Sequence, residues 1–224
     1  MAQGRRFDLI VFDMDGTLVD TKDGIAETIR AVLRERGIDA PSAASIYPLI
    51  GLPLVEILKR YLPAGTGSDE IAALATSYRA SYRREALSLV RPFPDVRAIL
   101  ADLRESDRRL AIATGRTQAM ADDVLKLAGL TEYFDLVLGV DRVARPKPAP
   151  DLALAALHHL DIPAARALVV GDTVHDVEMG RGAGAATCAV TYGAQSRSEL
   201  APSRPDHTID RFADLPAVVE SSDH

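Results

Sequence analysis

Residues 9–12 (LIVF) and 13–20 (DMDGTLVD) decide the fold, because an apolar run leads directly into two carboxylates, Asp13 and Asp15. The consecutive apolar side chains predict a strand over residues 6–12 that is buried on both faces. In an extended chain, side chains two positions apart point the same way. Buried carboxylates held together cost free energy unless a proton or a cation such as Mg²⁺ compensates them. The stretch therefore predicts a metal and a phosphate at the end of a strand.

The composition is that of a globular protein, with 224 residues of which 47% are hydrophobic and 26% are charged. The net charge of -6 argues against partners such as nucleic acid or an anionic membrane, which require a basic surface. The single cysteine, Cys188, lies in an apolar run and is expected in the core. The apolar run near the N-terminus is too short for a signal peptide or a membrane span, so a cytoplasmic location is expected.

From residue 90 onward, apolar runs typical of buried strands alternate with helical patterns. This alternation predicts a doubly wound α/β fold, in which helices cover both faces of a parallel sheet. Ligands then bind beyond the carboxyl ends of the strands. The expected strands are 110–113, 135–139, 167–171, 185–190 and 208–209, and the expected helices are 95–105, 118–128, 150–160, 174–182 and 212–219.

Residues 21–89 show no convincing strand pattern and are punctuated by proline and glycine. Thr21 or a neighbour is expected to cap a helix that Gly37 ends, and shorter helices are expected at 54–61 and 69–85. The pattern is that of a small α-helical cap inserted after the first strand. The expected domains are a core of residues 1–20 and 90–224 and a cap of residues 21–89.

Polar residues follow the strand expected at 110–113. Thr114 supplies a hydroxyl, and Gly115 and Arg116 follow it with backbone N–H groups that suit a phosphate. In isolation, an ordinary turn between a strand and a helix explains these three residues equally well.

Two further motifs occur later in the chain. Lys147 stands between prolines that hold the backbone extended, which predicts a rigidly placed charge, whereas most lysines are solvated. Asp172 follows the strand expected at 167–171, and Asp176 lies one helical turn beyond it. Taken alone, Asp172 is equally suited to be a helix N-cap, and His175 receives no role.

In this order, the four motifs resemble those of the haloacid-dehalogenase superfamily, in the branch that includes phosphoglycolate phosphatases. The first motif is DMDGT at residues 13–17, and the others centre on Thr114, Lys147 and Asp172. The resemblance implies a Rossmann-like core with an inserted helical cap. In many relatives an asparagine follows the threonine of the second motif, where Gly115 stands here.

The resemblance also implies roles for these residues. Asp13 is the expected nucleophile, which forms an aspartyl-phosphate, and Asp15 is the expected general acid and base. The implied Mg²⁺ ligands are Asp13, Asp172 and the backbone carbonyl of Asp15, with Asp176 contacting the metal or its ligands. Dehalogenases and phosphonate hydrolases of this superfamily lack the second aspartate, so Asp15 favours phosphate-ester chemistry.

The substrate is expected to be a small phosphorylated metabolite. Its phosphoryl oxygens are expected to contact Thr114, Lys147 and N–H groups near Gly16, which lets the backbone approach closely. Residues 49–53 (LIGLP) resemble the cap segment that faces the site in relatives, which makes Gly51 a candidate for substrate binding; a helix-breaking turn is the alternative.

The segment at residues 190–193 (VTYG) resembles the corresponding segment of phosphoglycolate phosphatases, which favours a small phosphorylated acid, with 2-phosphoglycolate as the candidate. Gly115 and Arg116 are candidates for substrate binding. Arg116 could meet the carboxylate of such an acid; an ordinary exposed arginine is the alternative. The expected function is therefore a Mg²⁺-dependent phosphatase.

Two kinds of alternative stay open. A sugar-phosphate mutase or a pyrophosphatase would use the same fold and the same motifs. A binding module for a phosphorylated ligand would keep the fold without catalysis. The sequence makes no prediction of oligomeric state.

Overall fold

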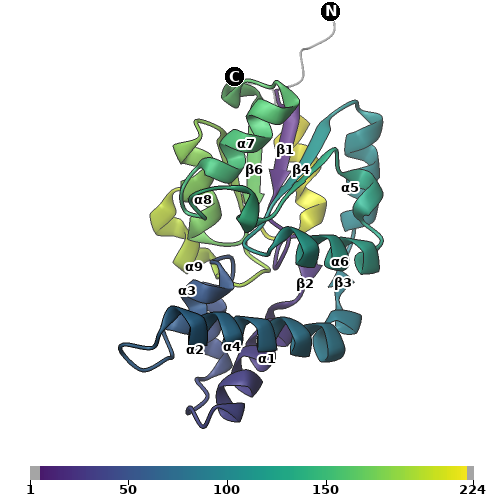
Figure 1. Cartoon of the computed structure of the whole chain (residues 1–224). Coiled ribbons are helices and arrows are strands. Elements are labelled where there is room, and N and C mark those ends of the chain that lie inside the picture. The colour runs from purple at the N-terminus through teal and green to yellow at the C-terminus, as the bar shows by residue number, and fades with distance from the viewer. Residues whose placement is uncertain (1–5, 221–224) are drawn as a thin grey trace, which may run out of the picture.

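The computed structural model describes residues 6–220, and its centre is a six-stranded sheet in the order β5-β4-β1-β6-β7-β8 (Figure 1). All neighbouring strands of this sheet are parallel. The strands are β1 (Leu9–Phe12), β4 (Arg109–Ala113), β5 (Leu136–Leu138), β6 (Ala167–Gly171), β7 (Ala186–Val190) and β8 (His207–Ile209). The predicted doubly wound α/β fold is confirmed.

The register of the three central strands brings their carboxyl ends level. Phe12 of β1 lies opposite Ile112 of β4 on one side and Val170 of β6 on the other. The Asp13 N–H continues this pairing and donates to the Val170 carbonyl at 2.8 Å. Because the strand order reverses direction at β1, a crevice forms at this edge of the sheet.

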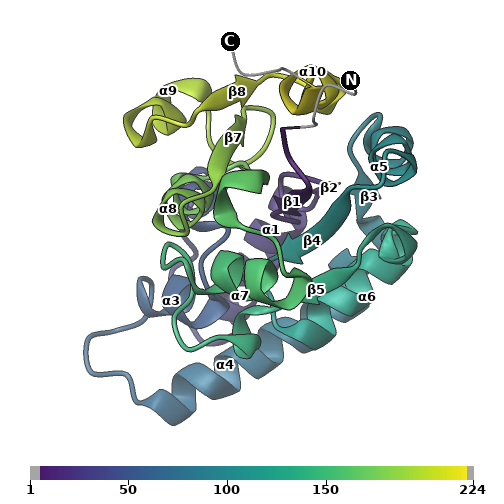
Figure 2. The same cartoon turned by 90° about the horizontal axis from the view of Figure 1, so that it is seen from above.

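Helices cover both faces of the sheet because successive strand side chains point to opposite sides. In β1, Ile10 and Phe12 belong to one buried apolar cluster, and Leu9 and Val11 belong to another. Figure 2 shows the two groups of helices on opposite sides of the sheet. The first cluster packs on α5 (Val96–Glu105), α6 (Gln118–Ala128) and α10 (Leu215–Glu220), and the second on α7 (Asp151–Leu160) and α8 (Val174–Gly182).

Between β2 (Val19–Asp20) and β3 (Arg91–Pro92) the chain forms a segment that consists of helices and turns. These two short strands pair antiparallel, so the segment leaves the sheet and returns to it at one place. Figure 1 shows its helices gathered beneath the sheet. They are α1 (Lys22–Glu35), α2 (Ala43–Ile46), α3 (Leu54–Lys59) and α4 (Ser68–Ser81).

The two ends of α1 follow the sequence prediction to different degrees. Thr21 is its N-cap residue, as predicted, but the Thr21 hydroxyl makes no capping bond and donates instead to Asp15 Oδ1 at 2.6 Å. At the other end Gly37 has a φ of 69°, which favours glycine and ends the helix where predicted. The Thr21 side chain thus contacts Asp15 of the predicted site, although Thr21 stands at the N-terminus of the helix.

Several element boundaries differ from the sequence prediction. The first strand begins at Leu9, not at residue 6, although Phe7 is buried. The helix expected over 69–85 ends at Ser81 and continues as a π-helical turn over Tyr82–Ala86. No glycine or proline marks this change, so periodicity alone extends the helix too far. The β2–β3 pair, α2 and α9 (Arg197–Leu200) were not predicted, because elements this short carry little periodic signal.

Candidate active site

Three adjacent strands deliver the predicted polar residues to one place. Asp13 follows β1, Thr114 follows β4 and Asp172 follows β6, and all three side chains are buried. The sequence predicted that these residues would share one sheet edge. The strand order explains why, since β4, β1 and β6 are direct neighbours.

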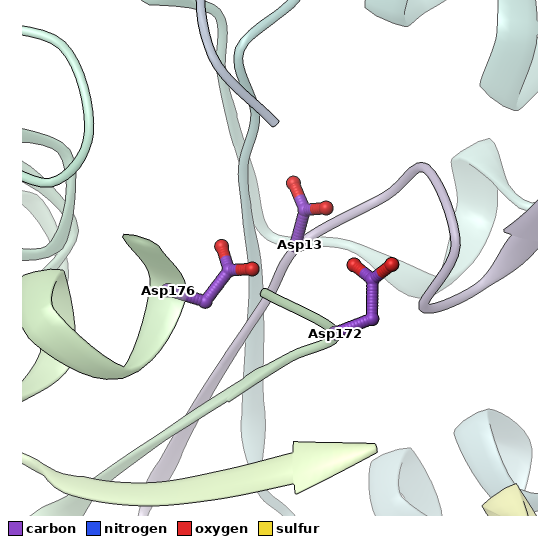
Figure 3. Close-up of side chains that lie close together, drawn as sticks. All are labelled: Asp13, Asp172 and Asp176. Atoms are coloured by element: carbon purple, nitrogen blue, oxygen red, sulfur yellow. The ribbon is translucent and has the colours of Figure 1, made fainter. Parts of the chain in front are cut away.

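Three carboxylates form a compact cluster at this edge. Figure 3 shows the side chains of Asp13, Asp172 and Asp176 close together, and one oxygen of each lies within 4.8 Å of the others. Asp176 stands in the first turn of α8, where its Oδ2 accepts from the Thr173 hydroxyl at 2.6 Å and from the Thr173 N–H at 3.0 Å. Helix capping therefore orients Asp176, and the N-cap of this helix is Thr173, not Asp172.

Asp172 is held by two donors from other parts of the chain. The Thr17 hydroxyl donates to Oδ1 at 3.2 Å, and the Ala194 N–H donates to Oδ2 at 2.6 Å. The Tyr192 hydroxyl in turn donates to the Thr17 carbonyl at 2.8 Å. The 190–193 segment, which the sequence linked to substrate class, thus lies among the groups that support Asp172.

Lys147 supplies the positive charge of the cluster. Its Nζ donates to Asp13 Oδ1 at 2.7 Å and to Asp176 Oδ1 at 2.6 Å, and its side chain is 0% exposed. Burial by itself lowers the pKa of Lys147, but the two carboxylates outweigh burial and hold that pKa above its ordinary value. Lys147 is therefore not a solvated loop lysine but a fixed cation.

The charges of the cluster do not balance without a further cation. Three carboxylates and one ammonium leave two formal negative charges uncompensated. Burial raises the pKa of Asp13 to about 7, against the opposing effect of Lys147, and burial together with Asp13 and Asp176 raises the pKa of Asp172. In addition, Asp13 Oδ2 is buried without a hydrogen-bond partner. Oxygen ligands with this charge deficit fit a hard divalent cation such as Mg²⁺.

Asp15 occupies a separate position beside this cluster. Arg116 binds it with two hydrogen bonds, from Nε to Oδ2 at 2.7 Å and from Nη2 to Oδ1 at 2.8 Å, and Thr21 donates to the same Oδ1. Both side chains of this ion pair are less than one-tenth exposed. The Asp15 carboxylate is thus paired with arginine, and the metal contact predicted for this residue concerns its backbone carbonyl.

Arg116 connects Asp15 to the helical segment. Its Nη2 donates to the Tyr82 hydroxyl at 2.9 Å, and its guanidinium carbon lies 4.4 Å from the centre of the Tyr82 ring. The Tyr82 ring stacks on Tyr78 of α4. The sequence proposed that Arg116 meets a substrate carboxylate, but Nε and Nη2 are already engaged within the protein.

Two glycines permit close approach at the site. At Gly16, φ is 79°, and a Cβ there would overlap the Asp172 carboxylate. The Gly16 N–H donates to the Val19 carbonyl at 2.9 Å. At Gly115, a Cβ would overlap the Gly51 carbonyl oxygen. Glycine at 115 therefore lets the 51–52 backbone pack against the second motif, which an asparagine in that position would prevent without a shift.

A cavity of about 120 Å³ lies between the sheet edge and the helical segment. Its wall includes Asp13, Asp15, Thr114 and Arg116, together with Gly51 from the helical segment. Gly51 thus shares a cavity with the predicted site residues, and its role in substrate binding stays a prediction. Asp172, Asp176 and Lys147 lie beside Asp13 and are not among the residues that line this cavity.

Residues 10–190 match the family described as haloacid dehalogenase-like hydrolase. The chain belongs to this family. The match includes all four motifs and the whole helical segment. The resemblance inferred from the motifs is thereby confirmed, and with it the expectation of a hydrolase.

Individual relatives within this haloacid dehalogenase-like family carry different names. A probable phosphatase, IndB, of Dickeya dadantii is 38% identical over 92% of this chain and 91% of its own length. Pyrophosphatase PpaX of Listeria monocytogenes is 30% identical over 96% of this chain and 97% of its own. The solved structure of a predicted phosphoglycolate phosphatase from Haemophilus somnus superimposes with a TM-score of 0.85 at 26% identity, covering 95% of this chain and 98% of that one.

Sequence reasoning missed the residues that hold this haloacid dehalogenase-like site together. Thr17 and Ala194 orient Asp172, and Tyr82 holds Arg116. The match of Thr17 to the first motif was the one available signal; Tyr82 lies in a helical pattern with nothing to distinguish it. Among residues 6–220, no helix combines the length and the apolar character that a membrane crossing needs.

Proposed function

We propose that this chain is a Mg²⁺-dependent phosphatase that hydrolyses a small phosphomonoester through an aspartyl-phosphate on Asp13. The observation that carries the proposal is Asp13 Oδ2, a buried carboxylate oxygen without a hydrogen-bond partner. Asp13 also lines the cavity, while its other oxygen is held by Lys147. An oxygen fixed in this way is available to attack phosphorus.

Asp13 acts as the nucleophile, and Asp15 acts as the general acid and then as the general base. In the first step an Asp13 oxygen bonds to phosphorus, the ester P–O bond breaks, and Asp15 gives its proton to the departing alkoxide. In the second step Asp15 takes a proton from water, whose oxygen displaces the Asp13 carboxylate and releases phosphate. Asp15 suits both steps because it lines the same cavity, and Arg116 holds its carboxylate in place.

Thr114 lines the cavity and would hold a phosphoryl oxygen, whereas Lys147 is bonded to Asp13 and Asp176 and holds the nucleophile in place. Asp13 and Asp172 would hold Mg²⁺ together with the backbone carbonyl of Asp15, and Asp176 would contact the metal or its ligands. When bound, Mg²⁺ supplies the positive charge that offsets repulsion between the nucleophile and the phosphate.

We assign residues 21–89 to a cap domain that closes over this site, with residues 1–20 and 90–224 as the core. The cavity wall supports this division, since it combines core residues with Gly51 and its neighbours. The substrate we propose is a small phosphorylated acid of the 2-phosphoglycolate type. A phosphoglycolate phosphatase name on one structural neighbour and the 190–193 segment support it.

The test is release of inorganic phosphate from a panel of phosphomonoesters, with pyrophosphate included, in Mg²⁺ and in EDTA. We expect turnover of small esters in Mg²⁺ and its loss in EDTA or with Ca²⁺, which tolerates looser geometry. Asp20→Asn is the matched control for Asp13→Asn, because Asp20 is exposed and does not line the cavity. Phosphate release that is equal in Mg²⁺ and in EDTA would contradict the metal-dependent mechanism. Phosphate release from pyrophosphate alone would show that the substrate is pyrophosphate and not a phosphomonoester.

A further inference from the structure

The cavity wall combines two chemically different sets of residues. One set contains the groups assigned above to the phosphoryl site, including Asp13, Asp15 and Thr114. The rest of the wall is mostly apolar and comes largely from the helical segment. Its apolar side chains include Ile25, Ile50, Leu54, Val55, Ile57 and Met120.

An apolar wall disfavours hydroxyl-rich or highly charged leaving groups. A buried hydroxyl without a partner costs free energy, and a second phosphate buried among aliphatic side chains costs more. Apart from Asp13, Asp15, Thr114 and the already paired Arg116, the polar side chains of the wall are those of Tyr78, Arg79 and Thr117. Three groups do not satisfy the hydroxyls of a sugar, whereas the apolar wall suits methylene groups.

Arg79 is the cation of the wall that is available to a ligand. It projects from α4 and lines the cavity in a half-buried position. Within residues 6–220, its guanidinium makes no hydrogen bond or ion pair with the protein. By contrast, Arg116, the other arginine of the wall, is bound to Asp15 and Tyr82. An unpaired guanidinium at an apolar wall is suited to a carboxylate, which it can bind with two hydrogen bonds.

We propose that the leaving group is a short aliphatic alcohol that ends in a carboxylate, with methylene groups against the apolar wall and the carboxylate on Arg79. The substrate is thus an ω-phosphooxy carboxylate longer than phosphoglycolate. This inference rests on the proposed phosphatase function and names the substrate class for it. The cavity of about 120 Å³ agrees with a small molecule, since drug-sized pockets measure roughly 300–1,000 Å³.

The first experiment compares kcat/KM for phosphate release across a chain-length series. The substrates are 2-phosphoglycolate, 3-phosphooxypropanoate, 4-phosphooxybutanoate and 6-phosphooxyhexanoate, with n-butyl phosphate, glycerol 3-phosphate and pyrophosphate as comparisons. Each added methylene that is buried should raise kcat/KM about fourfold until the carboxylate reaches Arg79. We therefore expect an optimum above 2-phosphoglycolate, and values below the optimum for the neutral, the hydroxylated and the pyrophosphate substrates.

The second experiment assigns the carboxylate preference to Arg79. The readout is the ratio of kcat/KM for the best carboxylate ester to that for the neutral alkyl ester of equal carbon number. In Arg79→Gln this ratio should fall by about tenfold or more, because the charge-assisted hydrogen bonds are lost. Arg83→Gln is the matched control: Arg83 lies one turn further along, pairs with Asp123 and does not line the cavity, so its ratio should stay that of the wild type.

The outcomes separate this inference from the proposed function. Phosphate release with an optimum at 2-phosphoglycolate, or with a preference for glycerol 3-phosphate or pyrophosphate, would overturn the inference and leave a hydrolase of phosphate compounds. A ratio that Arg79→Gln does not change would overturn the assignment of Arg79. Absence of metal-dependent release from every compound would overturn the proposed function, and the inference with it.

Discussion

The edge of the sheet and the wall contributed by the helical segment are opposites in composition. At the sheet edge, Asp13, Lys147, Asp172 and Asp176 are all ionisable, all buried and all hydrogen-bonded within the protein. The facing wall consists mainly of aliphatic side chains from short helices and turns. Parallel strands place their ends within narrow limits, whereas turns between short helices accept many sequences. The charged edge is thus formed by strand ends, and the facing apolar wall by short helices and turns.

Two of the contacts between these regions lie at the cavity. Arg116 at the sheet edge donates to Tyr82 of the helical segment, and Gly115 lies against the Gly51 carbonyl. These contacts set how closely the apolar wall approaches the charged edge.

The largest effect is expected for Asp13→Asn. Turnover should fall by at least about a thousandfold, because an amide cannot serve as the nucleophile. The free energy of unfolding without metal should not fall, since the carbonyl of the introduced amide can still accept from Lys147 and one buried negative charge is removed. Phosphate release and urea unfolding in EDTA measure the two effects. Wild-type turnover, or a loss of stability as large as that of Lys147→Met, would show that the edge is not organised around Asp13.

Lys147→Met tests the charge balance of the edge. Loss of the buried ammonium leaves Asp13 and Asp176 without their cation, which should lower the free energy of unfolding in EDTA by about 3–5 kcal/mol. Lys126→Met on the exposed side of α6 is the control and should change it by less than about 0.5 kcal/mol. Equal stability of the two variants in urea unfolding would mean that Lys147 is not needed to balance the carboxylates.

Gly115→Ala tests the closer of the two contacts. The added Cβ overlaps the Gly51 carbonyl, so the 51–52 segment must move, at a cost of about 1–3 kcal/mol in stability. We expect kcat/KM to fall by about tenfold because the cavity wall shifts with the segment. Gly67→Ala, with no atom within 4 Å of the added Cβ, provides the control in thermal unfolding and in phosphate release. Equal stability and equal phosphate release in the two variants would show that the 51–52 segment moves without cost and that its contact with Gly115 is not important.

Tyr82→Phe should have the smallest effect. It removes the hydroxyl that accepts from Arg116 but keeps the ring under the guanidinium, so stability should fall by about 1 kcal/mol. Tyr133→Phe is the control, because the structure records no hydrogen bond for the Tyr133 hydroxyl among the described residues. Denaturant unfolding of both variants measures the difference. A larger loss of stability in Tyr133→Phe than in Tyr82→Phe would show that the hydrogen bond between Arg116 and Tyr82 does not stabilise the contact between the two regions.

Much of the fold was predictable from local pattern. The helices over 118–128 and 174–182 begin and end where periodicity places them, and the sheet strands from residue 110 onward lie within one residue of their expected starts. Each is bounded by residues whose local chemistry ends a helix or a strand. The π turn at Tyr82–Ala86 was not predictable, because its sequence continues a helical pattern without a break.

The candidate site was predictable in its charged residues and not in their pairing. The sequence marks Asp13 and Asp172 because each follows an apolar strand, and it marks Lys147 because a proline stands on either side of it. The partner of Arg116 was not predictable, since its contact with Asp15 joins residues 101 positions apart. The significance of Gly115 was equally hidden, because it depends on where the Gly51 carbonyl lies.

The sequence by itself determined which chemical groups stand at the ends of the strands, and in which order, because strand and helix periodicity act over a few residues. The tertiary structure decided which groups touch. Lys147 reaches Asp13 across 134 positions and Thr17 reaches Asp172 across 155, and no local pattern encodes such contacts. The apolar wall that faces the charged edge is likewise a product of packing, since its side chains come from separate helices and turns that only the folded chain brings together.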